Sequence, residues 1–192
     1  MARANTKQVV GLGLITAIVI VLQFLGSFIK LGPFSVSLVL IPIVVGAALY
    51  GAKAGAWLGF VFGIVVLISG DAAAFLAVDQ LGTIVTVLLK GTLAGLGAGI
   101  VYELIERLNR YVAVAASAII CPVINTGIFL LGCKLFFMET VTEWATGMGF
   151  ADAGTYMIVG LVGLNFVFEL LINVIISPVT VRLIALGKKE HQ

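Results

Sequence analysis

Residues 156–185 read YMIVGLVGLNFVFELLINVIISPVTVRLIA, and within them only Glu169 and Arg182 are charged. A membrane-crossing helix needs about 20 apolar residues to span a bilayer core about 30 Å thick. This stretch meets that requirement, and it is long enough to tilt or to emerge from the bilayer. It predicts one transmembrane helix near the end of the sequence.

Five further apolar runs precede it, at residues 8–29, 36–50, 54–70, 82–102 and 112–137. Over the 192 residues, 61% of side chains are hydrophobic, 10% are charged and the mean hydropathy is +1.23, whereas a soluble domain is about 25% charged. We therefore predict an all-α integral membrane protein, a bundle of six transmembrane helices forming a single transmembrane domain over residues 1–192. The run 36–50 contains Pro42 and follows Gly32-Pro33, so we expect it to be short, kinked or partly extended.

The charged residues predict how the bundle is oriented. If the N-terminus is cytoplasmic, the outer side has Lys30 as its only clear basic residue and collects Asp71, Asp79, Glu139, Glu143 and Asp152. The inner side then receives Arg3, Lys7, Lys53, Arg107, Arg110, Arg182, Lys188 and Lys189. Because cytoplasmic loops are enriched in Lys and Arg, we expect both termini to be cytoplasmic.

Several functional classes find no support in the sequence. The formal net charge of +2 is too small to indicate nucleic-acid binding, and we find no phosphate-binding loop, dinucleotide fingerprint or zinc-protease motif. The only histidine, His191, lies in the C-terminal tail, so no serine or cysteine nucleophile has a plausible histidine. We expect the chain not to be an enzyme and to need no cofactor or metal.

Strongly polar side chains within the apolar runs are costly in a membrane and indicate function or an internal partner. Asn165, Glu169 and Asn173 recur at i, i+4 and i+8 and form one stripe that must face the bundle interior. At 1.5 Å per residue, Asn165 lies about 13 Å and Glu169 about 20 Å below the outer end. Lys90, about 12 Å deep, and Asn125 share this depth range. We predict a small polar cavity between the last three helices, open to the outer side.

The same residues allow other interpretations. Lys90 and Glu169 can simply pair with each other, and the asparagines can tie helices together by hydrogen bonds. The 139–155 connection is a candidate lid over the cavity, while its Trp144 can equally rest at the membrane interface. The candidate solute-contacting residues are Lys90, Asn125, Trp144, Asn165, Glu169 and Asn173.

Small residues at four-residue spacing let helices approach each other closely. Gly13 and Ala17 form such a pair in the first run, suited either to an internal contact or to docking of a partner helix. Gly91, Gly95 and Gly99 repeat the spacing over two turns, and we predict that they form an internal packing seam.

The chain resembles the substrate-binding S components of energy-coupling factor (ECF) vitamin transporters. The resemblance covers nearly the whole chain and rests on three blocks: LGPFSVSLVLIPIVVGAALYGAKAGAWLGFVFG at 31–63, LLKGTLAGLGAGIVY at 88–102 and GLNFVFELLINVIISPV at 163–179. The blocks are moderately specific for the family and poorly specific for the vitamin.

The resemblance implies a multi-pass subunit of a bacterial plasma membrane that binds a water-soluble vitamin or cofactor precursor near the outer face. Loops corresponding to 30–35 and 139–155 would gate the site. A small-residue patch on the first helix would dock onto a transmembrane coupling subunit, which is joined to two cytoplasmic ATPases. Gly13 and Ala17 match that patch, although the family pattern has alanine at both positions.

The solute does not follow from the blocks. Because Lys90 favours a solute with a carboxylate or another acceptor-rich group, we name pantothenate first, with riboflavin-like and folate-like solutes as alternatives. Two other classes remain open. One is a proton-coupled secondary transporter that uses Glu169 as its titrating group, and the other is an assembly subunit that binds no solute.

Overall fold

The computed structural model describes residues 6–28 and 37–190, with side chains as far as Ala185. Within these residues the protein is all-helical and contains no strand. The longer elements are α1 (Thr6–Gly26), α2 (Leu40–Tyr50), α3 (Ala52–Ile68), α5 (Gln80–Ile105), α6 (Arg110–Phe136), α7 (Met138–Gly147) and α9 (Gly163–Glu190). The short elements are α4 (Ala73–Leu76), α8 (Ala153–Thr155) and the π-helical η1 (Tyr156–Leu161).

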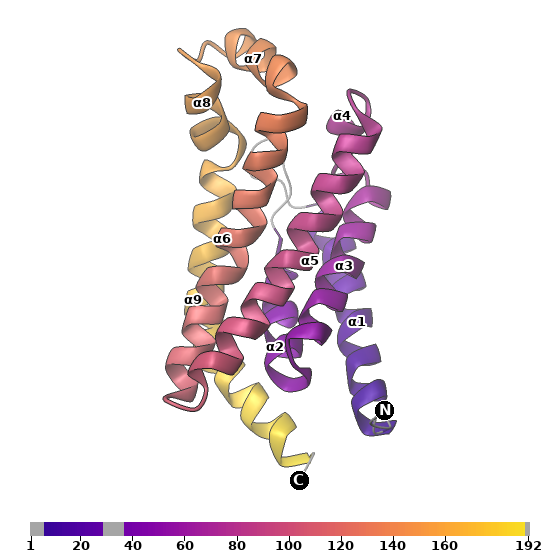
Figure 1. Ribbon diagram of the computed structural model, residues 1–192, viewed down its shortest axis with the longest axis vertical. Coiled ribbons are helices and arrows are strands. Elements are labelled where there is room, and N and C mark those ends of the chain that lie inside the picture. Colours follow the sequence, from indigo (N-terminus) through magenta and orange to yellow (C-terminus); the bar gives the residue numbers. More distant parts are fainter. Residues whose placement is uncertain (1–5, 29–36, 191–192) are drawn as a thin grey trace.

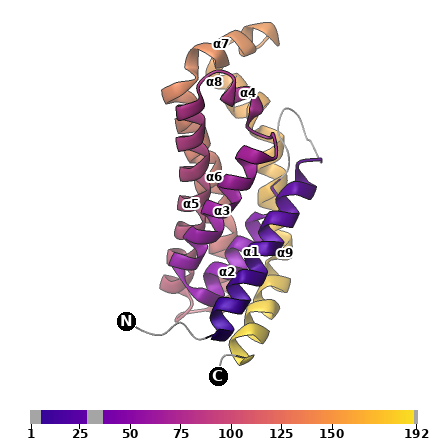
Figure 2. The same ribbon diagram turned by 90° about the vertical axis from the view of Figure 1, so that its right-hand side faces the viewer.

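The long helices lie side by side in one bundle (Figures 1 and 2). Helices α1, α3 and α6 run in one direction, and α5 and α9 return in the other. The start of α1 and the end of α9 therefore lie at the same end of the bundle, which we call the terminal end. Helices α4, α7 and α8 lie at the opposite end.

In the part of the chain that the structure describes, four helices are long and apolar enough to cross a membrane: α1, α5, α6 and the Gly163–Ala185 part of α9. The predicted runs 54–70 and 36–50 are also helical, but at 17 and 11 residues they are shorter. At 1.5 Å per residue these lengths give about 26 Å for α3 and about 17 Å for α2. Thus α2 has about half the length that the bilayer core requires.

Local sequence explains why α2 is short. The helix begins at Leu40, which places Pro42 in the first turn, where its missing N–H costs no helical hydrogen bond. It ends at Gly51, whose φ of +91° favours glycine. One residue later α3 begins, and its Ala52 N–H donates to Glu103 Oε1 at 2.8 Å. Helix α2 therefore occupies only the terminal half of the bundle (Figure 1).

The predicted glycine seam is confirmed as the contact between α5 and α3. Gly91 lies against Gly59, Gly95 against Gly55, and Gly99 against Ala52. A Cβ added at Gly91 or Gly95 would overlap the backbone carbonyl of the opposite glycine. These two helices therefore pack backbone to backbone, as small residues allow in a membrane.

The 139–155 connection, expected to be a loop, is mostly helical. Helix α7 buries Val141 and Ala145 in an apolar cluster with Phe75 and Tyr156. Asp152 caps α8 by accepting hydrogen bonds from the N–H and hydroxyl of Thr155, and these bonds lower the pKa of its carboxyl. The connection is thus a folded cap on the bundle (Figure 2).

The charged residues divide between the two ends as predicted, as far as the structure describes them. Asp71, Asp79, Glu139, Glu143 and Asp152 belong to the end with α4, α7 and α8, where Lys134 also lies in the last turn of α6. Lys7, Lys53, Arg107, Arg110 and Arg182 belong to the terminal end. Arg3 and Lys30 lie outside the described residues, as do the side chains of Lys188 and Lys189.

Candidate functional site

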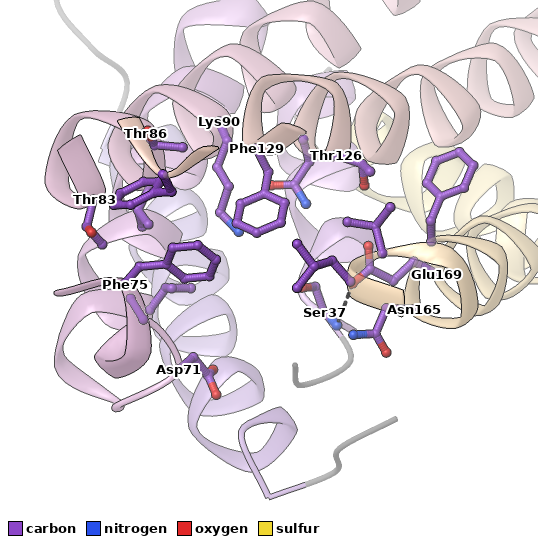
Figure 3. A pocket seen from close by; sticks show the side chains of 18 of the residues that line it. Ser37, Asp71, Phe75, Thr83, Thr86, Lys90, Thr126, Phe129, Asn165 and Glu169 are labelled. Carbon is purple, nitrogen blue, oxygen red and sulfur yellow. Dashed lines mark hydrogen bonds between the residues drawn. The ribbon is translucent and has the colours of Figure 1, made fainter. Parts of the chain in front are cut away.

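A cavity of about 80 Å³ lies inside the bundle, beyond the start of α2 (Figure 3). Helices α5, α6 and α9 supply most of its wall, as predicted, and α1, the residue Ser37 and the α3–α4 corner close it. The polar members of the wall are Gln23, Ser37, Asp71, Thr83, Thr86, Lys90, Asn125, Thr126, Asn165 and Glu169. The cavity thus brings together four of the six candidate solute-contacting residues.

Lys90 reaches the cavity between two aromatic rings. Its Nζ lies 5.6 Å from the ring centroid of Phe62 and 5.5 Å from that of Phe129, within the range of cation–π contact. Figure 3 shows Lys90 next to Phe129. Among the described residues, no carboxylate oxygen lies within 4.0 Å of this ammonium. Lys90 and Glu169 line the same cavity without a direct ion pair in the described structure, so the alternative that the two residues simply pair stays untested.

Glu169 lies on the opposite part of the wall and is only 6% exposed. Its Oε1 accepts a hydrogen bond of 2.9 Å from the backbone N–H of Ser37, just before α2 begins (Figure 3). The carboxylate therefore ties α9 to the chain that leads into α2. This contact could not be read from the stripe of polar residues on α9, because it joins positions 132 residues apart.

The other residues of the stripe have different surroundings. Asn165 is buried on the cavity wall, together with Asn125 from α6. Asn173 is not among the lining residues; its Nδ2 donates to the backbone carbonyl of Glu169 at 2.8 Å. The stripe thus faces the interior as predicted, but only its outer part reaches the cavity.

Sequence reasoning missed a polar pair at the cavity, Gln23 and Asp71. Gln23 Nε2 donates to Asp71 Oδ2 at 2.7 Å, and Ser69 Oγ also donates to Oδ2 at 3.3 Å. Gln23 is 2% exposed, so a strongly polar residue is buried within the first apolar run. That signal was available, because such burial in a membrane helix indicates an internal partner.

A second, outer pocket of about 590 Å³ lies between the α3–α4 corner and α7. Trp144 lines this pocket and not the inner cavity, together with Glu143, Met148 and Tyr156. Asp71, Phe75 and Leu161 line both spaces. The Phe75 ring packs on Phe129, Phe137 and Trp144, with centroid distances of 5.6, 4.9 and 5.4 Å. Phe75 therefore belongs to a wall that the two spaces share.

The inner cavity is contracted in this structure. Sites for drug-sized ligands have volumes of about 300 Å³ or more, whereas this cavity has about 80 Å³. A solute of vitamin size therefore requires movement of the wall, whose apolar part includes Phe75, Phe129, Phe137 and Phe166.

Gly13 and Ala17 lie on the outer surface of α1, far from any site interior. Both residues are exposed, and a Cβ added to Gly13 would meet no atom within 4 Å. Gly11, in contrast, faces the Tyr50 side chain inside the bundle. The alternative of an internal contact at Gly13 and Ala17 is thus wrong, and the patch is open to another molecule.

Comparison with known families explains this architecture. The model of the family described as "ECF transporter, substrate-specific component" matches residues 7–184. The chain belongs to this family. No curated protein and no solved structure matches the chain significantly.

Membership makes the chain a substrate-specific subunit of an ECF importer and a multi-pass membrane protein. Components of this family bind a small-molecule substrate for transport and work with other ECF subunits. They are transport subunits and not enzymes. The family match does not identify the substrate of this S component.

Proposed function

We propose that this S component captures an anionic, water-soluble vitamin or cofactor precursor in the inner cavity and releases it toward the cytoplasm. Lys90 carries the proposal. Its ammonium reaches the cavity wall with two rings beside it and no carboxylate within 4.0 Å in the described part of the chain. An ammonium at the cavity wall that forms no direct ion pair within the described residues favours an anionic ligand group, because charge-assisted hydrogen bonds are the strong ones.

The transport cycle requires a defined topology and partners. We propose six membrane-embedded helices, with α2 and α3 embedded but short, and with both termini in the cytoplasm of a bacterium. The basic terminal end of the bundle supports this orientation. Delivery requires a transmembrane coupling subunit and two ATPases, with Gly13 and Ala17 as the docking patch. We find no nucleotide-binding motif in the sequence, and this supports the proposal that separate subunits hydrolyse ATP.

We propose that the solute enters through the outer pocket and passes the Phe75 wall. Trp144, Asp71 and Glu143 line the outer pocket, so Trp144 contacts the solute on its way to the inner cavity. Within the cavity the contacts are Lys90, Asn125, Asn165 and Glu169. Pantothenate remains the first choice of solute, because it combines a carboxylate with a small, flexible body, and riboflavin-like or folate-like solutes are the alternatives.

The experiment compares binding with transport. The purified chain is reconstituted in liposomes, alone and with coupling subunit and ATPases, and radiolabelled pantothenate is measured inside and bound. We expect binding by the chain alone and uptake only with partners and ATP. Uptake by the chain alone under a proton gradient contradicts the proposal and favours a secondary transporter that uses Glu169. Native mass spectrometry of the purified chain shows in parallel whether another solute is retained.

A further inference from the structure

The polar atoms of the inner cavity are not equally satisfied. Asp71 accepts from Gln23 and Ser69, Glu169 accepts from Ser37, and the Thr83 hydroxyl donates to the Asp79 carbonyl at 2.6 Å. Within the described part of the chain, Gln23 Oε1, Thr86 Oγ1 and Asn125 Oδ1 are buried atoms of the wall without a hydrogen-bond partner. The carboxylates of Asp71 and Glu169 thus accept hydrogen bonds from the protein, whereas the amide oxygens of Gln23 and Asn125 have no donor among the described residues.

Such atoms are exceptional in a folded protein. More than about 90% of buried polar groups have a partner in the protein or in ordered water, and a group left without one destabilises the fold. Gln23, Thr86 and Asn125 are between 2% and 5% exposed, so bulk water does not satisfy them. All three line the same cavity. Ordered water in the cavity can supply the missing hydrogen bonds, and a solute that displaces this water has to replace them.

The orientation of the Gln23 amide follows from its neighbour. An ionised carboxylate only accepts hydrogen bonds, so the amide nitrogen of Gln23 must face Asp71. Oε1 is then the free end of the amide, and it can only accept. A solute group next to Gln23 must therefore donate, as a hydroxyl or an amide N–H does. In this structure Asn125 Oδ1 also has no donor among the described residues, so in this orientation of its amide it can accept from a solute group in the same way.

We propose that Gln23 and Asn125 determine specificity by accepting hydrogen bonds from hydroxyl or amide N–H groups of a solute whose anionic group is held by Lys90. The substrate class is thus an organic anion that also carries hydrogen-bond donors. This inference rests on the proposed function and narrows it, because a plain carboxylic acid without donors leaves both amide oxygens unsatisfied.

The experiment uses two probes that differ in one group. Pantothenate carries a carboxylate, hydroxyl groups and an amide, and panthenol has an alcohol in place of the carboxylate. Affinities for the purified full chain are measured by isothermal titration calorimetry. We expect panthenol to bind at least about tenfold more weakly than pantothenate, the usual effect of a charge-assisted hydrogen bond. Lys90→Met removes this difference.

The donor contacts are tested by a matched pair of asparagines. Asn125→Leu removes an unpartnered amide from the cavity wall, whereas Asn173→Leu removes a buried amide that bonds to its own helix and does not line the cavity. We expect Asn125→Leu to weaken binding of both probes about three- to tenfold. Asn173→Leu changes the melting temperature but leaves the affinity within about twofold.

Gln23 needs a separate control because it also bonds to Asp71. Gln23→Met removes both Oε1 and the hydrogen bond to Asp71. Asp71→Ala keeps Oε1 but removes that hydrogen bond, together with the bond from Ser69 and a carboxylate of the wall. A larger loss of affinity in Gln23→Met than in Asp71→Ala supports solute contact by Oε1.

Three results each overturn the inference. They are equal losses of affinity in Gln23→Met and Asp71→Ala, equal losses in the two asparagine variants, or equal affinity for the two probes. If neither probe binds, native mass spectrometry identifies the retained solute, and a cationic solute or one without donors overturns the inference. A chain that retains no solute contradicts the proposed function itself.

Discussion

At the scale of single residues, the site is defined by which polar groups the protein leaves without partners. Lys90 has aromatic faces for neighbours, while Glu169 has a backbone N–H. Two ionisable residues at similar depth in the membrane thus have different surroundings. The proposed role of the first is to hold a ligand anion, whereas the second accepts a hydrogen bond from the chain that leads into α2.

We predict that Lys90→Met weakens binding of an anionic solute about tenfold to hundredfold, since a hydrogen bond to a charged group contributes about 1.5–3 kcal/mol. Because Lys90 forms no ion pair with Glu169 in the described structure, its removal does not strand a paired carboxylate. The melting temperature in detergent should therefore stay the same or rise. A large drop in melting temperature that the double variant Lys90→Met, Glu169→Gln restores would show that the two residues depend on each other.

Glu169 is predicted to act through its acceptor oxygen and not through its proton. Glu169→Gln keeps a carbonyl that accepts from the Ser37 N–H, so we expect ATP-dependent uptake to persist at a reduced level. Glu169→Ala leaves that N–H without its partner and should lower the melting temperature, because an unsatisfied buried donor costs about 1–3 kcal/mol. Uptake that is abolished in Glu169→Gln while solute binding stays normal would instead favour a proton relay.

At the scale of elements, two contacts position the cavity: the α3–α5 seam and the wall formed by α4. The seam brings two backbones together at Gly59 and Gly91, and it thereby sets the position of Lys90 one residue away. Helix α4 has only four residues, yet its Phe75 touches rings from α6 and α7. Two close contacts thus position the cavity walls. One is Gly59 against Gly91, and the other is the Phe75 ring against its aromatic neighbours.

The seam is tested by adding one methyl group. Gly59→Ala places a Cβ against the Gly91 carbonyl, and overpacking of this kind costs about 1–3 kcal/mol of stability. Gly127→Ala on α6 is the control, since a Cβ there meets nothing within 4 Å. We expect a clear fall in detergent melting temperature for Gly59→Ala and none for Gly127→Ala. Equal melting temperatures would show that the two helices separate at little cost.

The wall is tested through the rate at which bound solute leaves. Phe75→Leu shortens a side chain that lines both the inner cavity and the outer pocket, so we expect dissociation of radiolabelled solute to become several-fold faster. Phe137→Leu is the control, because Phe137 belongs to the same aromatic cluster but lines only the inner cavity. Similar acceleration by both variants would indicate general loosening of the cluster and argue against a barrier at Phe75.

At the scale of the whole molecule, the bundle presents a lipid-facing surface on which α1 carries a flat patch. Gly13 and Ala17 are exposed there, between larger apolar side chains such as Leu14 and Ile18. Because hydrophobic burial gives little drive between helices in lipid, close approach over small residues is what favours a specific helix contact. The exposure of these two small residues supports the proposal that a coupling subunit docks on this patch.

We predict that Gly13→Leu and Ala17→Leu leave solute affinity unchanged and abolish ATP-dependent uptake, because added bulk prevents close approach of a partner helix. Co-purification with the coupling subunit measures the contact directly. Val167→Leu adds bulk at an exposed position on α9 and serves as the control, with normal uptake expected. Normal co-purification of both α1 variants would assign docking to another surface.

Composition and periodicity by themselves determined that the chain is a helical membrane protein. They also determined on which side of each helix the polar residues lie. Apolar runs of about 20 residues have few structures available to them in a bilayer, because every backbone group must be bonded within the segment. For the same reason Asn165 and Glu169 had to face inward, and Gly91, Gly95 and Gly99 had to face another helix. Local sequence also predicted the shortened α2 from Pro42 and its neighbours.

Only the tertiary structure decided which inward-facing groups meet. It separated Lys90 from Glu169, gave Glu169 to the Ser37 N–H, and placed Trp144 in an outer pocket instead of the inner cavity. It also brought Gln23 and Asp71 together from positions 48 residues apart. The physical reason is that helical periodicity fixes the direction of a side chain around its own axis. Distances between helices depend instead on their packing, rotation and relative depth, which contacts along the whole bundle set together.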